Sequence, residues 1–267
     1  MFKNFLLKTS IVVTTYNRPD ALELVIKSIL SQKSKPFEVI IADDGSDKST
    51  LELVNRYKNC ASTKIIHSWH EDKGFRAARS RNKAISETSG DYIILIDGDM
   101  ILDSSFVEDH IRNAKPGQFI QGSRVFLTEK ITQDLLRGEK FKLNFFSSEI
   151  SNRKNQIRSR LLSKSFSFQK NNLNGIKTCN MSFFKVDCLN INGFNNEIEG
   201  WGREDSEFAA RLLNNGISRL NLKFAAIQYH LFHRIESKKS LKNNDLILQN
   251  AIRNRILRCE SGINEYL

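Results

Sequence analysis

The first part of the chain alternates short apolar runs with stretches of helical periodicity. The pattern Asn17-Arg18-Pro19-Asp20 is typical of a helix start, and the apolar residues that follow it recur on one helical face. The predicted strands span residues 10–15, 37–42, 64–68 and 92–97, and the predicted helices follow Pro19 and span residues 51–57 and 74–89. Because strand and helix alternate this regularly, we expect an α/β fold, a Rossmann-like mostly parallel sheet with helices on both faces.

The second part of the chain is less regular. We expect strands over residues 119–127, 176–186 and 220–229, and helices over residues 131–136, 204–214 and 241–259. Gly216 follows the second of these helices and is a good C-cap residue. Residues 141–174 form a polar, basic segment without a clear period, and no repeat or low-complexity linker divides the chain.

Composition restricts the class of protein and its partners. The chain has 267 residues, of which 40% are hydrophobic and 27% charged, values that are ordinary for a globular protein with a substantial core. A formal net charge of +11 favours anionic partners such as nucleotide phosphates, nucleic acid or an anionic membrane surface. The four scattered cysteines indicate reduced thiols, no apolar span reaches the roughly 20 residues of a transmembrane helix, and residues 1–8 do not form a convincing signal peptide. We therefore expect a cytoplasmic location.

Two carboxylates close the apolar run 92–96. Asp97 and Asp99 flank Gly98 there, so the run is predicted to be a buried strand that carries oxygen ligands at its carboxyl end. Mg²⁺ and Mn²⁺ prefer such ligands together with substrate phosphates, and ligands bind at this edge of an open α/β sheet. Asp-Gly after apolar residues is also a strong β-turn signal, so this motif alone does not decide between a metal site and a turn.

Two further acidic groups stand at expected element boundaries. Asp43-Asp44-Gly45-Ser46 ends the strand 37–42, where a carboxylate can accept hydrogen bonds from a base or a ribose, or simply form a turn. Trp201-Gly202-Arg203-Glu204-Asp205 opens a late helix. Acidic residues are common in the first turn of a helix, but the preceding aromatic ring and glycine also suit a platform for a sugar ring.

These motifs, in this order, resemble family 2 glycosyltransferases of the GT-A fold. The stretches that carry the resemblance are residues 12–18, 41–46, 74–82, 96–99 and 200–205. The last of them, with Asn180-Met181-Ser182 and Gly193-Phe194 before it, is similar to the carboxyl-terminal part of galactosyltransferase-like and chondroitin-polymerase-like enzymes. The resemblance runs from about Ser10 to His233, with the exception of the basic segment 130–174.

The resemblance implies a role for each matching residue. The nucleotide would contact Thr15, Tyr16, Asn17, Arg18, Asp44 (with Asp43 less favoured) and Arg76, and Asp97 would contact ribose or metal. The metal would be held by Asp99, Asp97 and His230, although the nearby His233 makes the histidine assignment ambiguous. Asp205 would be the general base, Glu204 would help to hold the acceptor sugar, and Asn180, Trp201 and Gly202 would complete the substrate site.

The implied activity is inverting transfer of a sugar from a UDP-sugar to a saccharide acceptor, including lipid-linked saccharides, with Mn²⁺ or Mg²⁺ as cofactor. The expected setting is synthesis of a bacterial surface polysaccharide, lipopolysaccharide or capsule. Such an in-line displacement needs one base on the acceptor side and a cation on the leaving diphosphate. Within one compact domain, residues 1–127 would form the nucleotide-sugar half and residues 128–267 the acceptor half, with the basic segment and a C-terminal helix.

Other interpretations fit fewer features. A sugar-phosphate nucleotidyltransferase usually carries a glycine-rich phosphate loop near the first strand, and residues 14–17 do not form one. A nucleic-acid-binding protein is supported only by the net charge, so we expect no nucleic acid partner. A catalytically silent glycan-binding relative would not need the full set of carboxylates that is present.

The basic segment also has two interpretations. It carries Arg153, Arg158, Lys164 and Lys170, with Phe145, Phe146, Phe166 and Phe168 among the charges. Such a segment is usually a solvated loop. The functional alternative is contact with an acidic acceptor or with anionic lipid, and cations interleaved with aromatic rings suit peripheral contact with an anionic membrane at its cytoplasmic face.

Overall fold

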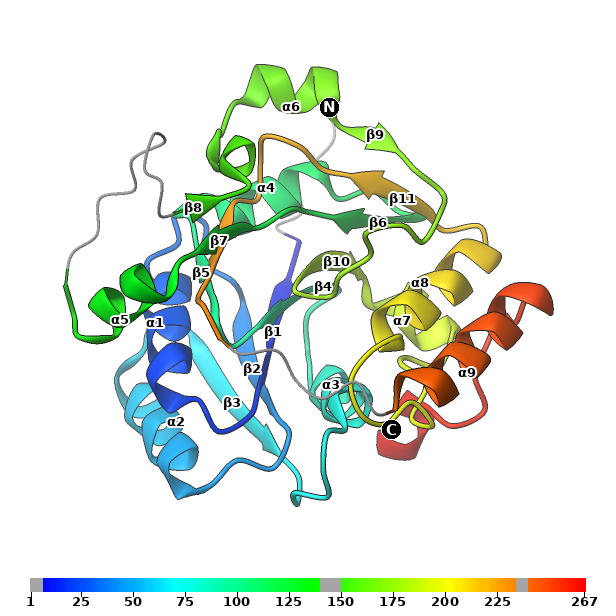
Figure 1. Cartoon of the computed structure of the whole chain (residues 1–267), viewed down its shortest axis with the longest axis horizontal. Coiled ribbons are helices and arrows are strands. Elements are labelled where there is room, and N and C mark those ends of the chain that lie inside the picture. Colours follow the sequence, from blue (N-terminus) through cyan, green and yellow to red (C-terminus); the bar gives the residue numbers. More distant parts are fainter. Residues whose placement is uncertain (1–6, 140–149, 234–239) are drawn as a thin grey trace.

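The computed structural model describes residues 7–139, 150–233 and 240–267. Its main element is a mixed, mostly parallel sheet (Figure 1). In spatial order its strands are β3 (Lys64–Trp69), β2 (Glu38–Asp43), β1 (Thr9–Thr15), β4 (Tyr92–Asp97), β10 (Asn180–Phe184), β6 (Gln118–Gln121), β11 (Ser218–Asn221) and β9 (Phe168–Gln169). The strands β1 to β4 are mutually parallel, and β10 lies antiparallel to both of its neighbours.

Helices cover both faces of this sheet, because successive side chains of each buried strand point to opposite faces. On β1, Ile11 and Val13 pack with one set of helices and Val12 with the other. The first set is α1 (Pro19–Leu30), α2 (Lys48–Cys60) and α4 (Phe106–Asn113), and the second is α3 (Ala77–Ser86), α7 (Lys185–Asn190) and α8 (Glu204–Asn214). The α/β fold expected from the sequence is confirmed.

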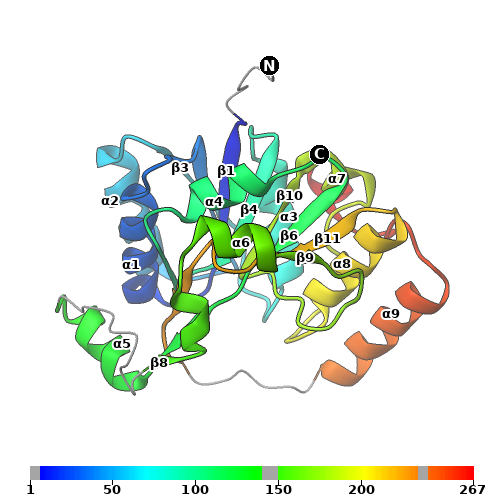
Figure 2. The same ribbon diagram turned by 90° about the horizontal axis from the view of Figure 1, so that it is seen from above.

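A smaller sheet lies beside the first. Its strands, in order, are β5 (Met100–Leu102), β12 (Gln228–His230), β7 (Val125–Leu127) and β8 (Ile150–Ser151). Helix α5 (Glu129–Leu136) packs on it through Ile131, which joins Val125, Leu127 and Tyr229 in a separate apolar cluster. Helices α5 and α9 (Leu241–Arg253) lie on opposite sides of the molecule (Figure 2).

The sequence predicts single strands in two segments of the chain, but in the structure each segment contributes one strand to each of the two sheets. The expectation of one strand over 119–127 is wrong: β6 ends before Gly122, where a side-chain Cβ would lie 2.2 Å from Asn180 Oδ1. One strand over 220–229 is also wrong, because Phe224 and Ala226 take positive φ angles of 55° and 48° between β11 and β12. Left-handed backbone is rare in residues with a side chain, so apolarity alone could not reveal this break.

The basic segment has more structure than its sequence pattern predicts. It contains β8, the short 3₁₀ turn Arg153–Gln156, α6 (Arg160–Phe166) and β9, which pairs with β11. The C-terminal helix ends at Arg253, earlier than expected, and a 3₁₀ turn over Ile263–Tyr266 follows. Phe145, Phe146 and most of residues 1–8 lie outside the described residues. Within the described ranges, no helix combines the length and the apolar character that a membrane span requires.

Candidate active site

Strand register brings the predicted donor residues to one edge of the main sheet. Thr15 of β1 lies opposite Asp43 of β2, and Thr14 lies opposite Asp97 of β4. On the other side of β4, Asn180 of β10 lies opposite Ile96. The carboxyl ends of three parallel strands therefore meet where α/β folds bind their ligands.

Asp99 lies at the centre of a candidate metal site. Its Oδ2 is 3.4 Å from His230 Nε2 and 3.3 Å from His233 Nε2, and the ligand atoms of the three side chains all lie within 4.8 Å of one another. Pairing of β12 with β5 sets this arrangement, because His230 lies opposite Met100 and the Leu231 N–H donates to the Asp99 carbonyl at 2.9 Å. Asp99 Oδ1 is buried and has no hydrogen-bond partner. One carboxylate and two imidazoles fit a divalent transition metal such as Mn²⁺.

The surroundings of the two neighbouring carboxylates separate their pKa values. Burial opposes ionisation of Asp99, but the hydrogen bond and charge of His230 and the charges of His233 and Arg18 lower its pKa. Arg18 Nη1 lies 3.6 Å from Asp99 Oδ2. Burial raises the pKa of Asp97, and the charge of Asp99 adds to this rise while Arg81 opposes it. Asp99 is therefore more readily ionised than Asp97 and is the better ligand for a cation. Asp97 lies beside Arg81 and outside the three-residue cluster.

Asp43 and Asp44 are engaged within the protein. Asp43, 1% exposed, accepts from the Ser46 N–H at 2.8 Å, and its Oδ2 lies 2.7 Å from His67 Nε2. Asp44 Oδ1 lies 2.7 Å from His70 Nε2, and Oδ2 accepts from the Arg76 N–H at 2.8 Å. Both carboxylates therefore fix the loops that follow β2 and β3. Uracil recognition by Asp44 stays a prediction.

The other residues that are predicted to bind the nucleotide-sugar donor lie around these loops. Tyr16, 47% exposed, donates its hydroxyl to Asp72 Oδ2 at 2.9 Å. Asn17, with φ 46°, donates its N–H to Ser46 Oγ at 2.8 Å and accepts from the Asp47 N–H at 2.9 Å. The Arg76 guanidinium donates to the Glu71 carbonyl, and its Nε is buried without a partner. The loop after β1 is therefore held against the loop after β2, with an exposed aromatic ring beside it.

The predicted acceptor residues stand at the start of α8, in a backbone segment with unusual φ angles. Gly200, Gly202 and Arg203 have φ angles of 72°, 102° and 82°. Helix α9 holds this segment, because Asn244 Nδ2 donates to the carbonyls of Glu199 at 3.0 Å and Gly202 at 2.9 Å. Trp201 is half-buried in it. A left-handed arginine is a strained conformation, and such strain is common at functional sites.

Asp205 has the properties of a general base. Burial raises its pKa to about 6, the negative charge of Glu204 adds to the rise, and Lys177 and Arg81 partly offset it. A base with a pKa near the working pH combines adequate ionisation with adequate basicity. Glu204 Oε2 is buried without a hydrogen-bond partner.

Arg81 connects the donor and acceptor carboxylates, a role that the sequence did not predict. It is 4% exposed, with Nη2 3.5 Å from Asp97 Oδ1, Nη1 3.3 Å from Glu204 Oε1, and Nε donating to Thr14 Oγ1 at 3.1 Å. The sequence left open a solvated helix face or an internal ion pair, and the ion pair is confirmed. In the sequence, its place among the apolar residues of the helix, between Ala78 and Ile85, could have indicated a buried arginine that needs an ion-pair partner.

Asn180 is already saturated by internal hydrogen bonds. Its Nδ2 donates to the carbonyls of Ser123 at 2.7 Å and Ala226 at 2.9 Å, and its Oδ1 lies 3.0 Å from His110 Nε2. These bonds connect β10 to the two segments in which the chain passes between the sheets. Its predicted contact with substrate stays a prediction.

Comparison with known proteins agrees with this geometry. The family described as "Glycosyl transferase family 2" matches residues 10–189, the part of the chain that carries all the donor-side motifs. The chain belongs to glycosyl transferase family 2. Residues 160–234 also match the family described as "N-terminal domain of galactosyltransferase", which confirms the second resemblance found in the sequence.

Two bacterial relatives of this family 2 glycosyltransferase are informative. Chondroitin synthase of Escherichia coli is 26% identical over 244 residues, which cover 83% of this chain and 34% of the relative. Cholesterol galactosyltransferase of Borreliella burgdorferi is 34% identical over 108 residues, which cover 40% of this chain and 29% of the relative. The chain therefore spans about a third of the length of these relatives.

A solved structure supports the GT-A fold. Staphylococcus aureus TarS residues 1–349 in complex with UDP-GlcNAc aligns with a TM-score of 0.63 at 17% identity, over 97% of this chain and 69% of that one. A UDP complex of the same protein aligns with a TM-score of 0.62. The GT-A fold expected from the sequence is confirmed.

Proposed function

We propose that this family 2 glycosyltransferase moves a sugar from a UDP-sugar to a saccharide acceptor with inversion, and that it requires Mn²⁺ or Mg²⁺. The observation that carries the proposal is the ion-pair bridge that Arg81 forms between Asp97 and Glu204, which links two charged centres. On one side Asp99 and two histidines can hold a cation, and on the other Asp205 can act as a base. The complexes of TarS with UDP and UDP-GlcNAc support a UDP-sugar as donor.

Each centre would serve one side of a single displacement. Asp205 would take the proton of the acceptor hydroxyl as its oxygen attacks the anomeric carbon, and Glu204 and Trp201 would orient the acceptor sugar. Arg81 would hold Glu204 and Asp97 in place and limit repulsion between them. A bound divalent cation would supply positive charge to the departing diphosphate, and Asp99, His230 and His233 are the residues that would hold it. Asp97, Asp44, Tyr16 and Arg76 would contact the nucleotide.

The relatives also suggest the biological setting. The chain resembles bacterial enzymes named chondroitin synthase and cholesterol galactosyltransferase, and we propose a role in the synthesis of a surface polysaccharide, lipopolysaccharide or capsule. Exposed Leu161, Phe166 and Phe168 accompany the cations of α6, so we propose peripheral contact with the cytoplasmic face of the membrane. Sedimentation with vesicles containing phosphatidylglycerol should then weaken in Leu161→Asp, and unchanged sedimentation would contradict this part.

A transfer assay tests the proposed reaction. The protein, a panel of UDP-sugars, saccharide acceptors and Mn²⁺ should yield a glycosylated product by mass spectrometry, with anomeric configuration opposite to that of the donor by nuclear magnetic resonance. Asp134→Asn, on the outer helix α5, is the matched control and should retain activity. A retained configuration, or full activity in excess chelator, would contradict the proposal.

A further inference from the structure

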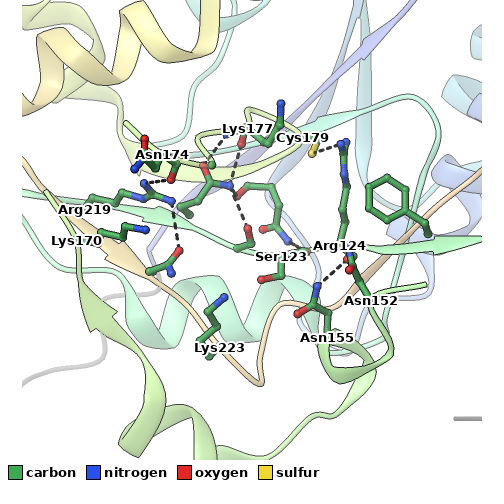
Figure 3. Close-up of a pocket in the computed structure, with 16 residues that line it drawn as sticks. Ser123, Arg124, Asn152, Asn155, Lys170, Asn174, Lys177, Cys179, Arg219 and Lys223 are labelled. Atoms are coloured by element: carbon green, nitrogen blue, oxygen red, sulfur yellow. Dashed lines mark hydrogen bonds between the residues drawn. The ribbon is translucent and has the colours of Figure 1, made fainter. Parts of the chain in front are cut away.

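A basic cavity of about 260 Å³ is lined by Lys177 and Arg219, among other residues (Figure 3). It is bounded by the end of β6, the segment before β10 and the end of β11. Five cations and no carboxylate occur among the residues that line it, and these cations are Arg124, Lys170, Lys177, Arg219 and Lys223. Figure 3 shows Lys170 and Arg219 on one side and Arg124 on the other.

Arg219 is the best-defined part of this cavity. It is only 2% exposed, and its Nη1 donates to the carbonyls of Asn172 and Asn174, both at 2.9 Å. Its Nη2 donates to Asn221 Oδ1 at 3.3 Å, while Nε is buried without a partner. These acceptors orient the guanidinium but do not neutralise it. A buried charge without a counterion is costly, and burial lowers the pKa of Arg219.

Two lysines add like charge to Arg219. The pairing of β9 with β11 brings Lys170 beside it, since the Lys170 N–H donates to the Arg219 carbonyl at 3.0 Å. Burial lowers the pKa of Lys223, and the charges of Arg219 and Lys170 lower it further. Among the described residues no carboxylate forms an ion pair with these three cations. A bound anion would remove this repulsion.

A second recess of similar size contains basic side chains that form ion pairs with carboxylates. It is lined by Arg158 and Arg160, among others. Arg158 Nη2 lies 2.7 Å from Asp109 Oδ1, and Arg160 Nη2 lies 3.1 Å from Glu108 Oε1. Both arginines therefore have internal counterions. The cluster around Arg219 has none in the described chain.

The cavity also reaches toward the reacting groups. Cys179 and Arg124 line one end, and the charge of Arg124 acts on Asp97. Lys177 also lines the cavity, and its charge acts on Asp205. Asn180 lines the cavity as well, and it pairs with Ile96, the residue before Asp97. A saccharide bound at Asp205 would then extend into the cavity toward Arg219.

We propose that this cavity binds an anionic group, a carboxylate or a phosphate, on the acceptor saccharide. This inference rests on the proposed glycosyl transfer and specifies its acceptor as an acidic one. The planar guanidinium of Arg219 matches the oxygen spacing of either anion, and Lys170 and Lys223 supply the remaining charge.

Titrations followed by nuclear magnetic resonance test the inference at constant ionic strength. The probes are sodium glucuronate, inorganic phosphate and neutral glucose, and their relative affinities distinguish a carboxylate from a phosphate. Wild-type protein should bind at least one anion and not glucose. Because Arg219→Ala could unfold the protein, the variant is Lys170→Ala with Lys223→Ala, which should bind about tenfold more weakly. Arg160→Ala with Lys164→Ala removes equal charge from the other recess and should bind as wild type.

Three results would overturn the inference. The first is no saturable binding of either anion, or equal binding by wild type and the Lys170/Lys223 variant. The second is that the Lys170/Lys223 variant loses affinity for UDP with Mn²⁺ by the same factor as for the anion. That result would assign these cations to the binding of the nucleotide-sugar donor. The third is that wild-type protein binds neither anion, while the Lys170/Lys223 variant loses binding to phosphatidylglycerol vesicles. That result would assign these cations to membrane contact. Absence of UDP binding by wild type would instead contradict the proposed function.

Discussion

Two pairs of aspartates stand at the ends of β2 and β4, the strands on either side of β1, and they differ in what their oxygens contact. Asp43 and Asp44 meet two histidines and two backbone N–H groups. Asp97 and Asp99 meet arginines and histidines at distances of 3.3 Å to 3.6 Å, and Asp99 Oδ1 meets nothing. Although both pairs fit a strand-end carboxylate motif, the first pair is engaged by internal contacts that hold the loops, and the second has the contacts expected of a ligand site. The contacts of the carboxylate oxygens distinguish the two aspartate pairs, which the sequence alone cannot do.

The largest effect should come from Asp99. Asp99→Asn removes the charge that would hold the cation, so we expect transfer activity to fall about a thousandfold, equivalent to about 4 kcal/mol of transition-state stabilisation. The free energy of unfolding, measured in urea, should fall less than in Asp43→Asn, because one oxygen of Asp99 has no internal partner and the contacts of the other are 3.3 Å or longer. A variant with full activity, or one that loses stability and activity together, would remove the contrast between the two pairs.

Asp205 should have the next largest effect. Asp205→Asn should lower kcat at least about a hundredfold. In the wild-type protein kcat/KM should fall tenfold per pH unit below the Asp205 pKa of about 6, because the base must be ionised. The raised pKa also means that ionised Asp205 destabilises the folded protein as the pH rises through that value. Asp205→Asn should therefore be more stable than wild type at neutral pH and equal to it in acid, and the reverse order would contradict the assignment.

Asp43 should show the opposite pattern from Asp99. Asp43→Asn replaces a buried carboxylate that bonds to His67 and to the Ser46 N–H, so we expect a loss of about 2 kcal/mol in the free energy of unfolding. Activity at a temperature where the variant is folded should stay within a few-fold of wild type. Urea unfolding and initial rates on one preparation measure both, and abolished activity at unchanged stability would assign Asp43 to catalysis.

The smallest effect concerns Glu204. Glu204→Gln removes a negative charge beside Asp205 and frees Arg81 from one partner, so the pKa of Asp205 should fall. The acid limb of the pH–rate profile should then move to lower pH by less than about one unit. A limb that stays in place, or moves to higher pH, would show that Asp205 is not the group that titrates.

Strong local signals in the sequence predicted the parallel half of the fold and its site edge. The apolar run 92–96 is typical of a buried strand, and the end of that strand places Asp97 and Asp99. Long-range pairings left no signal in the local pattern. The contact of His67 in β3 with Asp43 was not predicted, and the proximity of His230 to Asp99, which depends on the pairing of β12 with β5, was implied only by the family resemblance. The sheet crossings at Gly122 and Phe224 depend on close packing and positive φ angles, which leave no periodic pattern.

Thermal unfolding with UDP-sugars tests the central claim that Asp99 supports metal-dependent donor binding. At 100 times its dissociation constant a ligand adds about 2.7 kcal/mol of stability. We predict that one UDP-sugar of a panel stabilises the wild-type protein with Mn²⁺ but not with chelator, and that Asp99→Asn loses the effect while Asp134→Asn keeps it. Equal stabilisation in chelator or in Asp99→Asn, or none by any UDP-sugar with Mn²⁺, would contradict the claim.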